Sequence, residues 1–127
     1  MYNEILLDKN AHPIHRGELK NFTKKIPLVN ASCGDKLMLY LRIESGVIVD
    51  GSFEGFGCAI SQASTDILLD EIIGKSEDAA KEICTKFKDY FFNSPENLTE
   101  LGDACALADI AKMPARTNCA LLPWTAF

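Results

Sequence analysis

The sequence lacks the features that mark membrane-spanning and nucleic-acid-binding chains. Nowhere in its 127 residues is there a run of about 18 apolar residues, the length at which a helix can span a bilayer. The 13 lysines and arginines form no cluster, and 18 acidic residues bring the net charge to −5, so no cationic surface for phosphates is predicted. We therefore expect no membrane association and no nucleic-acid partner.

The first residues also lack the basic segment and apolar run of a secretory signal. This absence predicts a cytoplasmic protein, in a compartment where cysteine thiols stay reduced. The five cysteines are an odd number for a disulfide framework, and no Cys-x-x-Cys pair occurs. Each cysteine is then a small buried residue, a metal ligand or a reactive thiol.

Hydrophobic periodicity predicts strands in the first half of the chain and helices in the second. Apolar and polar residues alternate along two stretches joined by Glu44-Ser45-Gly46, which indicates an antiparallel hairpin. In the second stretch Val47, Val49 and Phe53 are expected to face the core. A shorter apolar run contains Pro27, which has no N–H to donate and so suits the edge of a sheet. The predicted strands are 26–29, 36–43 and 47–53.

Spacings of three and four between apolar residues predict helices after the sheet. The first begins just after Cys58 and ends at Gly74, and Ser76 caps the next one. A last helix is expected to open at Pro114 and to stop near Leu122, where another proline follows. Further helical segments are predicted before residue 10 and, irregularly, across 98–113.

This order of elements predicts an α+β fold: a small antiparallel three-stranded β-sheet with helices packed on one face. No internal repeat and no linker rich in glycine or serine divides the sequence, so residues 1–127 are predicted to form a single domain. That length is sufficient to bury a core without the help of disulfides.

The five cysteines fall into two groups. Cys84 lies on an apolar helical stripe and Cys105 lies between alanines, so both are expected to be structural. Cys33, Cys58 and Cys119 instead lie at predicted junctions between loops and regular elements, and glycine flanks the first two. Three thiols in such positions are what a metal site assembled from separate elements requires.

Asp35 adds an oxygen donor two residues after Cys33. Three thiolates and one carboxylate would complete the four-coordinate shell that zinc prefers. A thiol at a helix N-terminus, such as that of Cys58, is favoured as thiolate, the form that binds metals. The separations between the cysteines match no zinc-finger pattern, so spacing alone leaves a purely structural role for all three open.

Three segments carry these candidate residues in order. They read Asn30-Ala31-Ser32-Cys33-Gly34-Asp35, Phe53-Glu54-Gly55-Phe56-Gly57-Cys58-Ala59-Ile60-Ser61-Gln62-Ala63-Ser64 and Pro114-Ala115-Arg116-Thr117-Asn118-Cys119-Ala120. Together with Tyr2-Asn3-Glu4-Ile5-Leu6-Leu7-Asp8 near the N-terminus and Leu101-Gly102-Asp103, they resemble the NifU/IscU-type iron–sulphur cluster assembly family. The resemblance runs over nearly the whole chain.

Two features make the chain similar to the SufU branch of that family. The scaffold branch has a histidine directly before its third cysteine, and here Asn118 stands at that position. The stretch between Asn93 and Met113 resembles the insertion that marks SufU-type members. Both features favour a zinc-bound protein over a housekeeping scaffold.

The resemblance implies a metal site formed by Cys33, Asp35, Cys58 and Cys119, with Arg116 as a supporting charge partner. It implies a sulfurtransferase-like acceptor that takes persulfide sulphur from a PLP-dependent cysteine desulfurase of the SufS type, with Cys33 as the reacting thiol. Further iron–sulphur assembly proteins are the implied downstream partners. Zinc is the implied cofactor.

Three alternatives remain open from the sequence. The same cysteines can hold a [2Fe–2S] cluster, which would make the chain a scaffold. A structural zinc or metal-free protein with only an interaction role is the second alternative. A thiol enzyme using cysteine and histidine is the third, but His12 and His15 share no motif with a cysteine, and we expect both histidines to be exposed.

Overall fold

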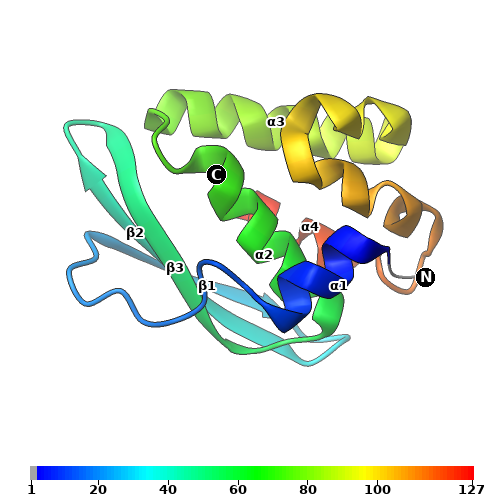
Figure 1. The fold of residues 1–127 in the computed structure, drawn as a ribbon, viewed down its shortest axis with the longest axis horizontal. Helices are drawn as coiled ribbons and strands as arrows, with labels where there is room; N and C mark the ends of the chain where they lie inside the picture. The colour runs from blue at the N-terminus through cyan, green and yellow to red at the C-terminus, as the bar shows by residue number, and fades with distance from the viewer. Residues whose placement is uncertain (1–2) are drawn as a thin grey trace.

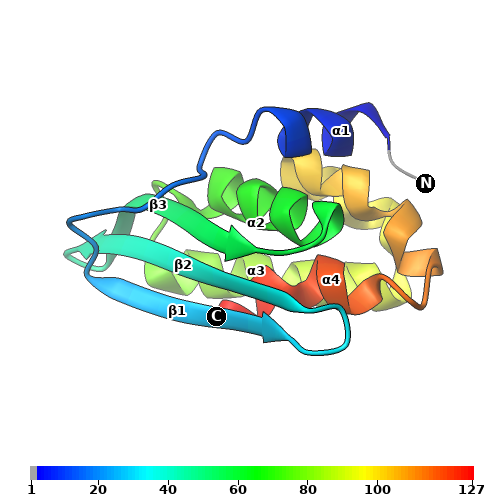
Figure 2. The same cartoon turned by 90° about the horizontal axis from the view of Figure 1, so that it is seen from below.

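The computed structural model describes residues 3–127 and has the predicted α+β architecture. Three antiparallel strands form a sheet in the order β1 (Lys24–Asn30), β2 (Asp35–Glu44) and β3 (Val47–Phe56). Helices gather on one face of this sheet, and among the described residues the other face carries no helix (Figure 1, Figure 2). The α-helices are α1 (Glu4–Ala11), α2 (Ala59–Ile72), α3 (Glu77–Asn93) and α4 (Thr117–Leu121), and the 3₁₀ segments are Pro95–Leu107, Asp109–Lys112 and Leu122–Ala126.

Successive residues of β2 face opposite sides of the sheet, as their alternation in polarity predicts. Leu37, Leu39 and Leu41 are buried against the helices, while Lys36 lies exposed on the opposite face. Pro27 lies in β1, an edge strand, as the missing N–H predicts. This sheet face, α2 and α3 enclose one hydrophobic core.

The prediction that Val49 faces the core is wrong. Arg42 pairs with Asp50 but Ile43 pairs with Ile48, so Val49 is an extra residue that bulges from β3. The bulge reverses the alternation on one side of it. Ile48 is therefore fully buried, Val49 is 40% exposed, and Phe53, beyond the bulge, points into the core as predicted.

Local capping signals give the helix boundaries of α2 and α3. Gly74 follows the end of α2 with φ of 91°, a backbone conformation that glycine adopts without strain. The Ser76 side chain accepts a hydrogen bond from the Ala79 N–H and so caps α3, as predicted. On α3, Cys84 is fully buried in the core, and Phe87 stacks on Trp124 at 3.9 Å between ring centroids.

The last α-helix begins three residues later in the chain than predicted. Pro114 lies in a turn, where the Arg116 N–H donates to the Met113 carbonyl, and α4 begins only at Thr117. A proline at a helix start is permitted but not required, so the turn contacts decide the boundary. The helix ends at Leu121, next to the predicted limit, and a 3₁₀ segment continues through the following proline.

A buried charge cluster attaches the N-terminal segment to α2. Lys9 on α1 is 5% exposed and forms ion pairs with Asp70 and with Asp66 at 3.3 Å. His15 donates its backbone N–H to Asp66 at 2.7 Å, and its ring nitrogen lies 2.7 Å from Asp70. The expectation of an exposed histidine is therefore wrong for His15, whose ring packs against α2, and correct for His12.

No helix within residues 3–127 is long and apolar enough to cross a membrane.

Candidate metal centre

Three separate parts of the fold bring the predicted site residues to one place. Cys33 lies in the turn between β1 and β2, and Asp35 is the first residue of β2. Cys58 directly precedes α2, and Cys119 lies in α4. The ligand atoms of Cys33, Asp35 and Cys119 all lie within 4.8 Å of one another, and the Cys33 and Cys119 sulphur atoms are 3.2 Å apart.

Cys58 contacts this triad through its backbone N–H and through its thiol, which interacts with that of Cys119, although the Cys58 sulphur lies outside the 4.8 Å cluster of the other three ligand atoms. Its N–H donates to Asp35 Oδ1 at 2.8 Å. Its side chain caps α2, because Sγ accepts a hydrogen bond from the Ser61 N–H at 3.4 Å. The predicted location just before a helix N-terminus is thus confirmed.

Asp35 is fully buried and is held by uncharged donors. Besides the Cys58 N–H, the Ser61 hydroxyl lies 3.2 Å from Oδ1, and the Asn30 amide donates to Oδ2 at 3.3 Å. Burying an isolated carboxylate is costly unless a cation or several hydrogen bonds compensate its charge. The three donors orient the group, and a metal ion would neutralise it.

The thiol of Cys119 is held in its neutral form in the metal-free protein. Burial raises its pKa most, and hydrogen bonding with the Cys33 and Cys58 thiols raises it further. Asn30 adds a contact from its amide to the Cys119 sulphur at 3.8 Å. Metal binding to this group would therefore release protons.

The donor set fits zinc. Zinc binds thiolate sulphur at about 2.3 Å and carboxylate oxygen at about 2.1 Å, usually with four ligands in a tetrahedron. Two ligand atoms on one such ion therefore lie about 3.4–3.8 Å apart. The triad meets this requirement within a small adjustment, and Cys58 is attached to it through Asp35. Soft thiolates also suit iron–sulphur clusters, so the residue types alone leave both groups possible.

Two residues at the site were not singled out from the sequence. Asn30 touches three of the four candidates: its carbonyl accepts from the Cys33 N–H at 3.3 Å, and its amide contacts Asp35 and Cys119. Ser61 touches Asp35 and Cys58. Their positions in the sequence could have indicated both residues. Asn30 directly precedes the turn that contains Cys33, and Ser61 is three residues after the helix cap Cys58.

Arg116 lies next to the site in the chain, and its carbonyl accepts from the Cys119 N–H at 3.1 Å. Its backbone therefore helps to form the first turn of α4. The role of its side chain as a charge partner stays a prediction.

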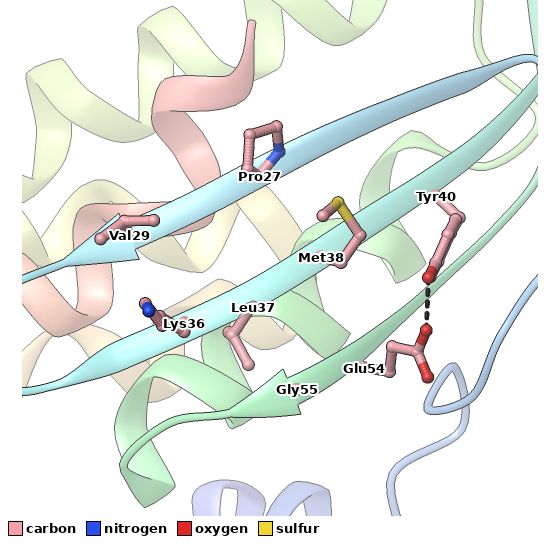
Figure 3. Close-up of a pocket in the computed structure, with 8 residues that line it drawn as sticks. All are labelled: Pro27, Val29, Lys36, Leu37, Met38, Tyr40, Glu54 and Gly55. Atoms are coloured by element: carbon pink, nitrogen blue, oxygen red, sulfur yellow. Dashed lines mark hydrogen bonds between the residues drawn. The ribbon is translucent and has the colours of Figure 1, made fainter.

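A groove of about 460 Å³ lies on the helix-free face of the sheet, apart from the thiols. Figure 3 shows Tyr40 pointing toward Glu54, to which its hydroxyl donates a hydrogen bond. This bond, followed by burial, raises the pKa of Tyr40 to about 12. The described lining contains no cysteine or histidine, so the groove does not offer the chemistry of the thiol site. Its lining residues are Pro27, Val29, Lys36, Leu37, Met38, Tyr40, Glu54 and Gly55.

Comparison with known proteins agrees with this geometry. The family described as NifU-like N terminal domain matches residues 1–120. The chain is 37% identical over 126 residues to the iron-sulfur cluster assembly scaffold protein IscU of Thermotoga maritima, which covers 98% of this chain and 87% of that protein. It is 32% identical over 127 residues to the zinc-dependent sulfurtransferase SufU of Bacillus subtilis, covering 99% of this chain and 86% of that protein.

A solved structure has the same fold over nearly the whole chain. It is the crystal structure of FiSufU from Fervidobacterium islandicum AW-1, described as an iron-sulfur cluster assembly scaffold protein for the SUF system. The TM-score is 0.90 at 35% sequence identity, with 98% of this chain and 91% of that chain covered. From the family match and these relatives, this chain belongs to the NifU-like N terminal domain family, in the SufU branch of the NifU/IscU-type proteins.

Proposed function

We propose that the chain acts as a single domain that accepts persulfide sulphur on Cys33 during iron–sulphur cluster assembly. The donor would be a PLP-dependent cysteine desulfurase of the SufS type. Cys33, Asp35, Cys58 and Cys119 would hold one zinc ion. The name of the SufU relative, a zinc-dependent sulfurtransferase, supports this reading.

The observation that carries the proposal is the difference in exposure within the triad. Asp35 and Cys119 are fully buried, whereas Cys33 is half-buried in a turn between two strands. A persulfide on another protein must reach the accepting sulphur directly. Cys33 is therefore the thiol of the triad best placed to receive it.

The transfer is a thiol–persulfide exchange, which needs no external oxidant. The Cys33 thiolate attacks the outer sulphur of the desulfurase persulfide, a new S–S bond forms on Cys33, and the desulfurase thiolate leaves. When bound, zinc supplies stabilisation of the deprotonated cysteines. Asn30 shapes the turn that presents Cys33, since its carbonyl accepts the Cys33 N–H.

A scaffold for a [2Fe–2S] cluster is the second candidate, with the cluster as cargo on the same cysteines. Two relatives are described as scaffold proteins, which favours it. Asn118 opposes it, because that position holds a histidine in the scaffold branch.

The test is metal content and sulphur acceptance of the purified protein. We expect about one zinc per chain, retained after anaerobic incubation with iron and sulphide, and one added sulphur on the Cys33 peptide after reaction with a cysteine desulfurase and cysteine. Cys33→Ser should abolish that addition, whereas Cys105→Ser, at a half-buried cysteine outside the site, should not.

Two results would reject the sulphur-acceptor assignment. One is a coloured product in which iron and sulphide replace the zinc, which would favour the scaffold. The other is unchanged sulphur acceptance by the Cys33→Ser variant.

A further inference from the structure

The hydroxyl of Ser61 lies buried between two of the proposed metal ligands. Ser61 is fully buried on the first turn of α2. Its Oγ lies 3.2 Å from Asp35 Oδ1, 3.1 Å from the Cys58 carbonyl oxygen and 3.7 Å from the Cys58 sulphur. A hydroxyl has a single proton, and a bond to a carboxylate is stronger than one to a neutral carbonyl. Ser61 therefore donates to Asp35.

The hydrogen bonds of Asp35 are unequal on its two oxygens. Oδ1 accepts from the Cys58 N–H at 2.8 Å and from Ser61, which occupies both lone pairs of that oxygen. Among the described residues, Oδ2 accepts a single hydrogen bond, the longer 3.3 Å bond from Asn30. The oxygen with a lone pair to spare is thus Oδ2. Asn30 also contacts the Cys119 sulphur, so its amide nitrogen links Oδ2 to the thiols.

The surrounding backbone leaves little space for the hydroxyl to move. A Cβ placed on Gly57 would lie 2.6 Å from Ser61 Oγ and 3.4 Å from Asp35 Oδ1. Only a residue without a side chain fits between them at that position. The hydroxyl is enclosed by Gly57, Asp35 and Cys58, so its direction is fixed by packing as well as by hydrogen bonding.

We propose that Ser61 is a positioning residue for the metal ligand Asp35. By holding Oδ1 toward the N-terminus of α2, its hydroxyl fixes the carboxylate so that Oδ2 is the oxygen offered to a cation. The inference rests on the proposed function in one respect, namely that Asp35 is a metal ligand. Residues that orient a ligand in this way typically change metal affinity about 10- to 100-fold when replaced.

The experiment is a double-mutant cycle read by zinc affinity. Zinc dissociation constants are measured by competition with a chromophoric chelator for the wild type, Ser61→Ala, Asp35→Asn and the double variant. We expect Ser61→Ala to weaken zinc binding about tenfold or more in the wild-type background. In the Asp35→Asn background it should change the affinity by less than about twofold, because its partner charge is gone.

A matched control separates this effect from a general loss of packing. Thr65 is fully buried one turn further along α2, and its hydroxyl donates to the Ser61 carbonyl rather than to a proposed ligand. Thr65→Val should leave zinc affinity within about twofold of the wild type. Cobalt-substituted protein gives a second readout, because a misplaced carboxylate alters the visible absorption bands of the metal in Ser61→Ala.

Each outcome decides between the possibilities. If Ser61→Ala weakens zinc binding by the same factor in the wild-type and Asp35→Asn backgrounds, Ser61 acts through Cys58 or through packing, and the inference is wrong. Unchanged affinity in the single variant would also overturn it. A wild-type protein that binds neither zinc nor cobalt would instead reject the metal site of the proposed function itself.

Discussion

The sulphur atoms of Cys33 and Cys119 lie 3.2 Å apart, although 86 positions separate the two residues in the chain. One belongs to the turn between β1 and β2, and the other belongs to α4. The two thiols can meet only when the sheet and the C-terminal segment have both packed around α2. The candidate metal centre is therefore a product of the complete fold, and its properties should respond to changes that leave the four ligands in place.

Replacing Asp35 by asparagine should separate metal binding from folding. The amide keeps the volume and the acceptor for the Cys58 N–H but removes the buried negative charge. We expect zinc affinity to fall at least about tenfold, because a neutral amide is a poorer ligand. The metal-free variant should unfold at a temperature equal to or above that of the metal-free wild type, since without a metal ion the buried carboxylate has hydrogen-bond donors but no countercharge.

Chelator competition and thermal unfolding of the metal-free proteins check the two parts separately. Unchanged zinc affinity would remove Asp35 from the ligand set. A large loss of stability without metal would indicate that the carboxylate is mainly structural.

Gly55 is expected to be intolerant of any side chain. Its φ of 120° is unfavourable for other residues, and an added Cβ would lie 2.3 Å from the Lys36 carbonyl oxygen across the β2–β3 pair. Gly55→Ala should therefore lower the free energy of unfolding by about 2 kcal/mol.

Gly46→Ala is the matched control in the hairpin turn. Gly46 also has a positive φ, of 78°, but nothing lies within 4 Å of the added Cβ. Gly46→Ala should therefore lower the free energy of unfolding by less, about 1 kcal/mol. Urea denaturation of both variants measures the difference, and equal losses would contradict the predicted clash with Lys36.

Cys84 should make stability sensitive to alkaline pH. Burial raises the pKa of its thiol from an ordinary 9.0 to about 12. The folded state therefore holds the proton more tightly than the unfolded state does. The resulting contribution to stability is fully present below about pH 9 and is lost as the pH rises toward the folded-state pKa.

The measurement is the free energy of unfolding of the reduced, metal-free protein at several pH values between neutrality and the alkaline range. The stability of the wild type should fall more steeply above about pH 9 than that of Cys84→Ala, which lacks the titrating group. Other titrating groups are common to both proteins and cancel in the comparison. Parallel curves would show that the Cys84 thiol titrates normally.

Much of the secondary structure follows from short-range patterns. The alternation of Leu37, Leu39 and Leu41 with polar residues predicts a half-buried strand, because side chains on a strand point to opposite faces in turn. Ser76 and Gly74 mark helix ends through hydrogen bonds and backbone angles that involve only neighbouring residues. Such features are visible in the sequence because their physical cause is local.

The sequence by itself thus determined the α+β class, most helix and strand boundaries and, through the resemblance of its motifs, four candidate ligands that include Asp35 and Cys58. Only the tertiary structure decided the bulge at Val49, the attachment of His15 to α2 and the enclosure of Ser61 beside Asp35. These features depend on contacts between segments far apart in the chain. Local periodicity and propensity carry no information about such contacts, because the energies that select them arise only when sheet and helices pack together.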